Sequence, residues 1–170
     1  MAATQTHPWL RGPVKDVAAG LQPVAHALMQ TIEEATAGVA GLPDDRLWRR
    51  PAGLASVGFH LKHIAGVVDR LFTYARGDAL SPEQRQALAQ ESREPDVPMT
   101  VTQLLDALTR RLEGAIEELK TLGASDLQAE RLVGSKKLPS TVQGLLFHAA
   151  EHSQRHVGQL LVTAKVVAED

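Results

Sequence analysis

Apolar residues recur every three or four positions along most of the chain, which is the spacing of one face of an α-helix. The first such segment runs from about residue 21 to residue 39, where Gly38 and Gly41 end the pattern. A second runs from residue 56, with Ser56 as its expected N-cap, to residue 75. The two apolar stripes consist of Leu21, Val24, Ala25, Leu28, Ile32 and Ala35, and of Val57, Leu61, Ile64, Val68, Leu71, Phe72 and Ala75.

Three later segments begin with Ser or Thr followed three residues on by Gln. They are SPEQ from Ser81, TVTQ from Thr100 and STVQ from Ser140. In such a capping box the two side chains bond to the free amides of the first helical turn. Pro82 suits the first helical position. These segments predict a short helix over residues 82–90 and long helices over 101–122 and 141–167.

Two stretches between the helices carry helix breakers. Residues 42–55 contain Pro43, Pro51 and Gly53 and are expected to form a connector from which Trp48 plugs the core. Residues 123–140 are polar and rich in breakers, and are expected to form a loop with at most one helical turn and no strand. Four long helices with short additional ones predict an all-α four-helix bundle, in a single domain spanning residues 1–170.

The composition of the chain excludes some classes of partner. Hydrophobic residues make up 44%, charged residues 22% and aromatic residues 4%, and the net charge is −2. Without a basic surface or aromatic platforms, nucleic acid is not an expected partner. The N-terminal stretch lacks the apolar core of a signal peptide, and no segment approaches the roughly 20 apolar residues of a membrane span. We therefore expect a cytoplasmic protein without a membrane partner.

The chain has no cysteine, so a metal would be bound by His, Asp or Glu.

Three of the seven histidines, His148, His152 and His156, are spaced four residues apart on the last predicted helix. Measured from the centre of that helix's apolar stripe, His156 lies about 50° away, His152 about 90° and His148 about 130°. His152 and His156 therefore border the interior, whereas His148 is more exposed. Two histidines at i and i+4 can bind one ion, although the spacing alone is a weak signal. The stripe consists of Val142, Leu145, Leu146, Ala149, Val157, Leu160, Leu161 and Ala164.

A second histidine pair, His60 and His63, lies on the helix predicted over residues 56–75. Facing helices of a bundle commonly build metal sites from such side chains. His60 is nearer the main apolar stripe, while His63 belongs to a second stripe that contains Phe59. Periodicity alone does not decide which of the two histidines would be a third ligand.

These motifs resemble a known family. SVGFHLKHIAGVVDRL, followed by LLFHAAEHSQRHVGQLL, is similar to the DinB/YfiT-like superfamily of metal-binding four-helix bundles, and HPWLRG and the LW and Pro before the second helix extend the resemblance over most of the chain. The resemblance implies one divalent metal ion, with zinc or nickel expected first, held by His63, His152 and His156. His60 is then a neighbour that bonds to a nearby group or, as the favoured interpretation, a satisfied histidine at the edge of the core. For His148 we favour a partly exposed helix residue, and the alternative is a residue that supports a ligand or replaces one.

Other polar residues near these histidines have less specific roles. Asp69 and Glu151 are conceivable acceptors for ligand N–H groups, but solvated salt bridges are the favoured interpretation. Gln159 either reaches the site or faces another helix. Tyr74 and Arg70 share the His63 side of their helix; we favour a packing role for Tyr74 and a surface position for Arg70.

The resemblance also implies a function. Related proteins include metal-dependent enzymes of the thiol-dependent S-transferase and isomerase type, so we expect a low-molecular-weight thiol such as bacillithiol, mycothiol or glutathione, a small-molecule substrate and a homodimer. Two alternatives stay open, a metal-dependent hydrolase and a non-catalytic metal-binding or stress-associated dimeric bundle. The sequence identifies neither catalytic residues nor substrate. An all-histidine site predicts that protons compete with the metal from about pH 6 downwards.

Overall fold

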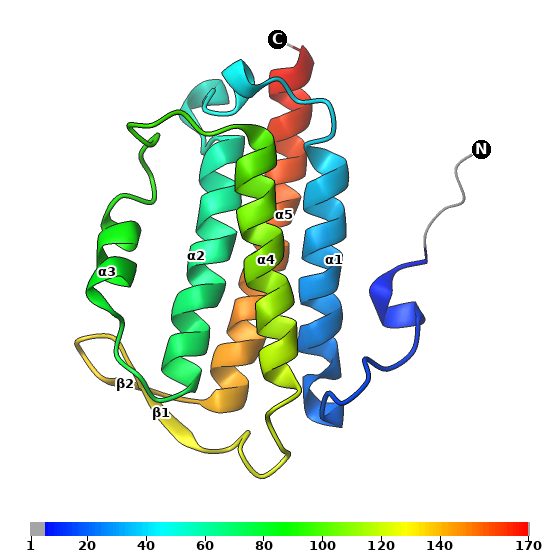
Figure 1. The fold of residues 1–170 in the computed structure, drawn as a ribbon, viewed down its shortest axis with the longest axis vertical. Coiled ribbons are helices and arrows are strands. Elements are labelled where there is room, and N and C mark those ends of the chain that lie inside the picture. The colour runs from blue at the N-terminus through cyan, green and yellow to red at the C-terminus, as the bar shows by residue number, and fades with distance from the viewer. Residues whose placement is uncertain (1–5, 170) are drawn as a thin grey trace.

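Four long helices lie side by side in the computed structural model, which describes residues 6–169; residues 1–5 and 170, the ends of the expected domain, lie outside (Figure 1). Helices α1 and α2 each pack against both α4 and α5. The predicted all-α four-helix bundle is confirmed, and each predicted helix is present with ends within three residues of those expected. The helices are α1 (Gln22–Gly38), α2 (Val57–Ala75), α3 (Pro82–Ala89), α4 (Val101–Leu119) and α5 (Val142–Glu169).

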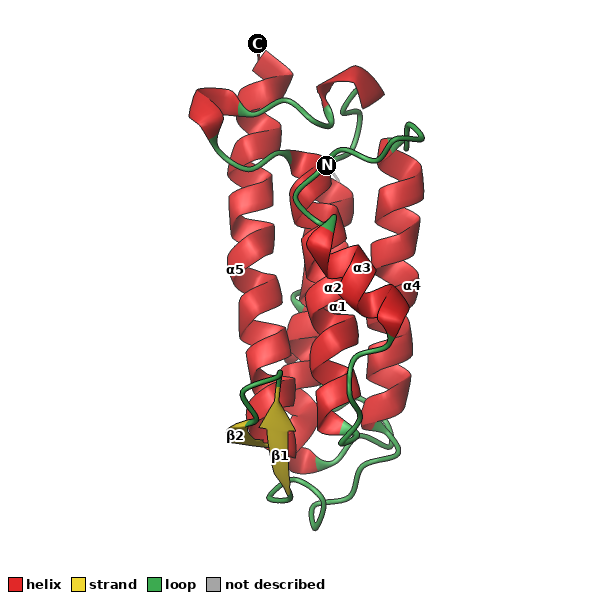
Figure 2. Ribbon diagram, turned by 90° about the vertical axis from the view of Figure 1, so that its left-hand side faces the viewer, coloured by secondary structure: helices red, strands yellow, loops and turns green. Residues whose placement is uncertain are grey.

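The chain direction alternates only in part. Helices α1 and α5 run in one direction, and α2 and α4 run in the other (Figure 1). To make α4 parallel to α2, residues 76–100 return along the outside of the bundle, and α3 lies within this crossover (Figures 1 and 2). Four-helix bundles with one long crossover are an established variant of the fold. The crossover places residues from outside the bundle next to α2.

The predicted caps explain where most helices begin. Ser56 Oγ accepts a hydrogen bond from the amide of Phe59 at 3.1 Å, and complete capping boxes form at Ser81 and Thr100. The capping box expected at Ser140 does not form. Ser140 lies in a strand, and Thr141 Oγ1 instead accepts from the amide of Gly144 at 3.0 Å at the start of α5. The cap is thus displaced by one residue.

A short β-hairpin replaces part of the loop expected over residues 123–140. Strands β1 (Glu130–Val133) and β2 (Leu138–Thr141) pair antiparallel, with Leu132 opposite Pro139. The hairpin lies at the end of the bundle opposite the C-terminus (Figures 1 and 2). Arg131 Nε donates to the carbonyl of Ala75 at 2.6 Å and so joins the hairpin to the end of α2. The expectation that this segment holds no strand was wrong.

The connector between α1 and α2 contains two short 3₁₀ helices, Asp44–Arg46 and Pro51–Gly53; two others, Pro8–Leu10 and Ala19–Leu21, precede α1. Leu47 is fully buried, whereas Trp48 is half-buried and packs against the edge of the core. A Cβ added at Gly58 would lie 2.9 Å from the Trp48 ring. Leu47 therefore fills the core, and Trp48 covers the start of α2.

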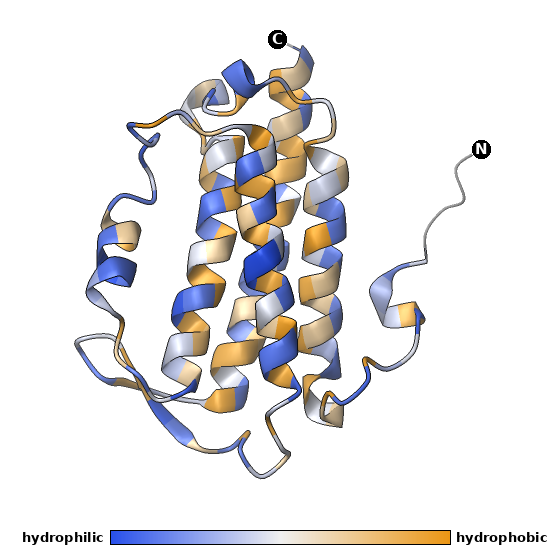
Figure 3. Ribbon diagram, viewed as in Figure 1, coloured by the Kyte–Doolittle hydropathy of each residue, from blue (hydrophilic) through white to orange (hydrophobic). Residues whose placement is uncertain are grey.

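Hydrophobic positions recur along each bundle helix, whereas α3 is mostly hydrophilic (Figure 3). The buried apolar residues form one core among α1, α2, α4 and α5, with Phe72 among its largest members. Among the helices of residues 6–169, none has the length and apolar character required to cross a bilayer. Burial of these stripes fixes how α2 faces α5, and the histidines lie at that contact.

Candidate metal centre

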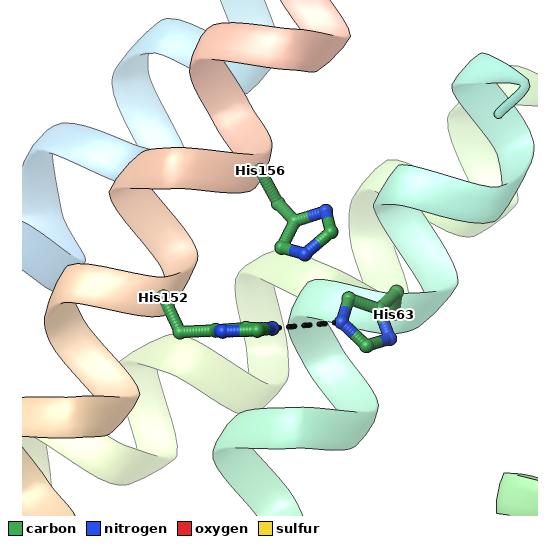
Figure 4. Close-up of side chains that lie close together, drawn as sticks. All are labelled: His63, His152 and His156. Carbon is green, nitrogen blue, oxygen red and sulfur yellow. Dashed lines mark hydrogen bonds between the residues drawn. The ribbon is translucent and has the colours of Figure 1, made fainter. Parts of the chain in front are cut away.

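Three histidine side chains converge between α2 and α5. His63 comes from α2 and His152 and His156 from α5, and one ring nitrogen from each lies within 4.8 Å of those of the other two (Figure 4). His63 Nε2 and His152 Nε2 are 2.9 Å apart. The His156 ring centroid lies 4.3 Å from that of His63 and 4.6 Å from that of His152. All three side chains are half-buried. The structure thus brings together the three residues that the resemblance implied.

A buried carboxylate holds the outer nitrogen of His63. Glu91 Oε2 lies 2.7 Å from His63 Nδ1. Arg70 donates to both oxygens of the same carboxylate, at 2.9 and 3.3 Å. Glu91 and Arg70 are each only 8% exposed. A Cβ at Gly66 would overlap Glu91 Oε1 and lie 2.7 Å from Arg70 Nη1, so a side chain at residue 66 would force this ion pair to shift.

Burial raises the cost of a charge on Glu91, but the hydrogen bonds and charges of His63 and Arg70 outweigh it, and the net effect lowers the Glu91 pKa. Glu91 is therefore an ionised acceptor at neutral pH. It accepts the N–H of His63 Nδ1, which leaves the lone pair of neutral His63 at Nε2, facing His152. A carboxylate behind a histidine in this way both orients the ring and increases its basicity.

His60 occupies the equivalent place behind His156. Its Nδ1 lies 3.1 Å from His156 Nδ1, and the residue is 2% exposed. Periodicity left open which histidine of α2 would join the pair on α5. In the structure His63 lies with His152 and His156, and His60 lies outside that group. The expectation that His60 bonds to a neighbour at the core edge agrees with this contact.

The environment favours neutral imidazoles. Desolvation by burial, assisted by the nearby His63, lowers the pKa of His60 to about 4. Desolvation, with His63, His152 and His60 close by, lowers the pKa of His156 to about 4 as well. Burial and the neighbouring histidines also lower the pKa of His152. Neutral imidazole is the form that binds metal.

The ring of Phe59, one turn before His63 on α2, packs against the rings of His63 and His156. Its ring stacks on that of His63 with centroids 5.0 Å apart and planes 13° from parallel. It also meets the His156 ring edge-on at 6.2 Å. The apolar ring limits the access of water to this side of the histidine cluster.

The donor chemistry of the cluster fits a divalent transition-metal ion. Three imidazoles are suitable ligands for zinc, nickel, iron or copper. The Nδ1 atom of His152 is buried and has no hydrogen-bond partner among residues 6–169. Because His63 Nε2 carries the lone pair, His152 Nε2–H donates to it in this arrangement, and the His152 Nε2 becomes available to an ion when its proton moves to Nδ1. Within the same residues, a second group of ligand type consists of His148, Glu151 and His152.

Comparison with known protein families identifies the family of the chain. A family model described as the DinB superfamily matches residues 27–160. The chain belongs to the DinB superfamily. The matched region contains His63, His152 and His156, together with Glu91 and His60. A comparison with curated proteins finds no match to the chain.

Glu151 and Asp69 of this DinB-superfamily chain each pair with an arginine, which is the interpretation favoured from the sequence. His148 is exposed, with half of its side-chain surface accessible, and bonds to Glu151, which also accepts from Arg155. This agrees with a solvated salt bridge for Glu151. Asp69 likewise pairs with Arg111 and accepts from Gln84.

Two expectations on α2 had different outcomes. Arg70 was expected at the surface, but it is buried against Glu91, because the crossover brings a carboxylate over that face of α2. Tyr74 packs against the core and lines a separate cavity near the hairpin, with Leu132 and Gly134. Tyr74 is therefore not part of the histidine cluster, as its packing role implied.

Sequence reasoning missed Glu91. The residue lies in the polar stretch QESREPD, 28 positions after His63, without a helical period that relates it to α2. Gln159 was left undecided; it lines a cavity beside His60 rather than joining the cluster. Only the three-dimensional course of the crossover shows the carboxylate behind His63.

Proposed function

We propose that the chain binds one divalent metal ion through His63, His152 and His156 and that the ion is the centre of a thiol-dependent transfer or isomerisation reaction. The observation that carries this proposal is the arrangement behind the rings. Glu91 engages His63 Nδ1, and His60 engages His156 Nδ1, so both rings offer Nε2 to the space they share with His152. Two of three rings are thus oriented before any ion arrives.

The number of ligands supports a reactive rather than a purely structural centre. Structural zinc sites use four protein ligands, whereas catalytic ones use three and leave a position for water or substrate. The cluster of His63, His152 and His156 contains three residues. A divalent ion in such a site lowers the pKa of a thiol or water that reaches its open position.

The other side chains have defined tasks in this proposal. Glu91 holds His63 in one tautomer, and Arg70 keeps the Glu91 carboxylate ionised and fixed. His60 restrains His156, and Phe59 covers one face of His63. Because the chain has no cysteine, the nucleophilic sulfur must come from a cosubstrate. The proton of the thiol would leave to solvent.

The proposal is tested with purified protein loaded with zinc or nickel and with metal-free protein. Each is mixed with glutathione, bacillithiol or mycothiol and a fluorogenic electrophile, and conjugate formation is followed. We expect turnover that requires metal and is lost in His152→Ala, with His148→Ala as the matched control that keeps it. Thiol binding is followed separately, through the absorption spectrum of cobalt-loaded protein.

The outcomes separate the competing functions. Metal binding without thiol-induced spectral change and without turnover across the panel would indicate a non-catalytic metal-binding protein. Metal-dependent ester or amide hydrolysis without any thiol would favour the hydrolase instead. Failure to bind zinc or nickel would contradict the proposal at its first step.

A further inference from the structure

A cavity of about 500 Å³ is lined by His60 but by none of His63, His152 and His156. Its volume is within the range of small-molecule sites. It forms between α5 and the connector that precedes α2. The lining residues are Leu54, Ala55, His60, Arg155, Gly158, Gln159, Val162 and Thr163.

His60 presents an unpartnered polar atom to this cavity. Only 2% of the surface of His60 is exposed, and its Nδ1 forms a hydrogen bond with His156 Nδ1. Its Nε2 has no hydrogen-bond partner in the described part of the chain, and the ring lines the cavity. A ligand that bonds to Nε2 would supply a hydrogen bond that the described part of the chain does not provide.

The remaining lining groups define the chemistry of a ligand. Leu54 and Val162 contribute apolar walls and are 63% and 66% exposed. Arg155 also lines the cavity, and its guanidinium gives one N–H to Glu151 and retains further donors. Gln159 adds an amide, and none of the described residues that line the cavity has a carboxylate. Apolar walls with donors and a positive charge suit an apolar molecule that carries a carboxylate.

Gly158 leaves the space open. A glycine within a helix costs roughly 0.5–1 kcal/mol relative to alanine. Apart from its chain neighbours and the backbone of its own helix, no heavy atom of residues 6–169 lies within 4 Å of the position that a Cβ at residue 158 would occupy. Packing within the chain therefore does not require glycine here, and a side chain at this position would extend into the cavity.

The hydrogen bond between the two histidines links the cavity to the metal site. When His156 binds an ion through Nε2, its proton must be on Nδ1, and Nδ1 then donates to His60 Nδ1. Neutral His60 consequently carries its own proton on Nε2. Metal binding would thus fix His60 as a hydrogen-bond donor toward the cavity, whereas in metal-free protein either direction of the bond is allowed.

We propose that this cavity binds a small apolar carboxylate, with His60 Nε2–H and Arg155 as the groups that recognise it, and that metal binding strengthens the interaction by fixing the His60 tautomer. The inference rests on the proposed metal centre and extends it by naming the class of molecule taken beside it. A hydrogen bond to a charged acceptor changes affinity by about tenfold or more.

The experiment uses phenylacetate, 2-phenylethylamine and 2-phenylethanol, which share an aromatic body but differ in charge and acceptor. Binding to zinc-loaded and metal-free protein is measured by ligand-observed and protein-observed NMR, with zinc content determined separately. We expect phenylacetate to bind zinc-loaded protein about tenfold more tightly than it binds metal-free protein, and more tightly than either other probe.

Two variants locate the probe. Gly158→Leu should fill the cavity and remove phenylacetate binding while one zinc ion per chain is retained. His60→Phe should weaken phenylacetate binding and make the remaining affinity independent of zinc. Phenylacetate binding that survives both variants would place the carboxylate directly on the ion and overturn the cavity assignment.

Three further results test the recognition of the carboxylate, the exposure of this face and the coupling to zinc. Equal affinity for the acid, the amine and the alcohol would contradict the proposed recognition. If Val162→Asp converts a dimer to a monomer in sedimentation experiments and phenylacetate does not bind, the face is covered by a second copy of the chain, and the ligand site is wrong. Absence of zinc binding, by contrast, would remove the coupling while phenylacetate binding to the metal-free cavity could still be measured.

Discussion

At the scale of single residues, the cluster divides into groups that would touch an ion and groups that hold them. His63, His152 and His156 converge, whereas His148 points to an exposed carboxylate on its own helix. We expect zinc-loaded protein to contain about one equivalent of metal and His156→Ala to lose it, because two imidazoles bind an ion much more weakly than three. Elemental analysis after gel filtration measures this. His148→Ala is the control and should retain the metal; loss of metal in His148→Ala but not in His63→Ala would assign the ion to the other group.

Glu91 is the residue-scale feature with the clearest effect on affinity. Glu91→Gln keeps the size of the side chain but removes its charge, so His63 loses a charged acceptor and Arg70 loses its partner. We expect the zinc dissociation constant to rise roughly 10- to 100-fold, the usual cost of altering such a partner. Competition with a chromophoric chelator measures it.

The matched control for Glu91→Gln is Glu151→Gln, which changes an exposed carboxylate that bonds to His148. It should leave zinc affinity within a few-fold of the parent protein. Equal losses in the two variants would show that overall charge, rather than the bond to His63, determines affinity.

The residues of the site were predictable to different degrees. The angle from the apolar stripe placed His152 and His156 at the border of the bundle interior, but His60 and His63 are three residues apart and lie close to the same side of α2. Family resemblance was needed to prefer His63. Glu91 could not be found because its contact with His63 depends on the path of the crossover, and no local pattern encodes that path.

At the scale of elements, two helical glycines have opposite surroundings. A Cβ at Gly58 of α2 would lie 2.9 Å from the Trp48 ring, while one at Gly114 of α4 would have no neighbouring side chain of the described residues within 4 Å. We expect Gly58→Ala to destabilise the protein by about 1–3 kcal/mol through overpacking. Gly114→Ala should stabilise it by roughly 0.5–1 kcal/mol through reduced backbone entropy. Urea denaturation followed by circular dichroism compares the two, and destabilisation of similar size in both would contradict the role of Trp48.

Elements with local signals were predictable, and those without were not. Capping boxes at Ser81 and Thr100 determine helix starts through bonds between residues three apart, so the sequence shows them directly. The hairpin has strands of only four residues without alternating burial on both strands. It is positioned by Arg131, which bonds to Ala75 at the end of α2, 56 residues away. Sequence reasoning over residues 123–140 could not include that contact.

At the scale of the whole molecule, the site depends on how the chain is connected. The crossover over residues 76–100 makes α4 parallel to α2 (Figure 1). It also contains Glu91, which bonds to His63 and Arg70 of α2. Antiparallel packing of α2 against α5 brings His63 level with the pair on α5. Folding therefore assembles the cluster from three separate segments, and its stability should respond to protonation of the cluster.

The sign of that response follows from the lowered pKa values. In the unfolded chain a histidine titrates near 6.5. In the folded metal-free protein the pKa of His60 and of His156 is about 4, since burial disfavours the charged form. Between these values the unfolded state binds more protons than the folded state, so stability rises with pH across this window. Metal-free protein should thus be most stable above about pH 6.5 and lose stability as the pH falls toward 4.

Metal adds a second dependence on pH with the same sign. An ion that binds the folded bundle raises its melting temperature by mass action. Protons compete for the ligand histidines, and because burial lowers the pKa of His152 and His156, competition at these rings begins below the value near pH 6 expected for unperturbed histidines. We expect the zinc-induced increase in melting temperature to be largest at pH 7.5, to shrink as the pH falls and to vanish near pH 4. Melting curves at pH 7.5, 6 and 4.5, with zinc and with chelator, measure both effects. His156→Ala should show no zinc-induced increase at any pH, and an increase of equal size at all three pH values in the parent protein would argue against ligation by histidine.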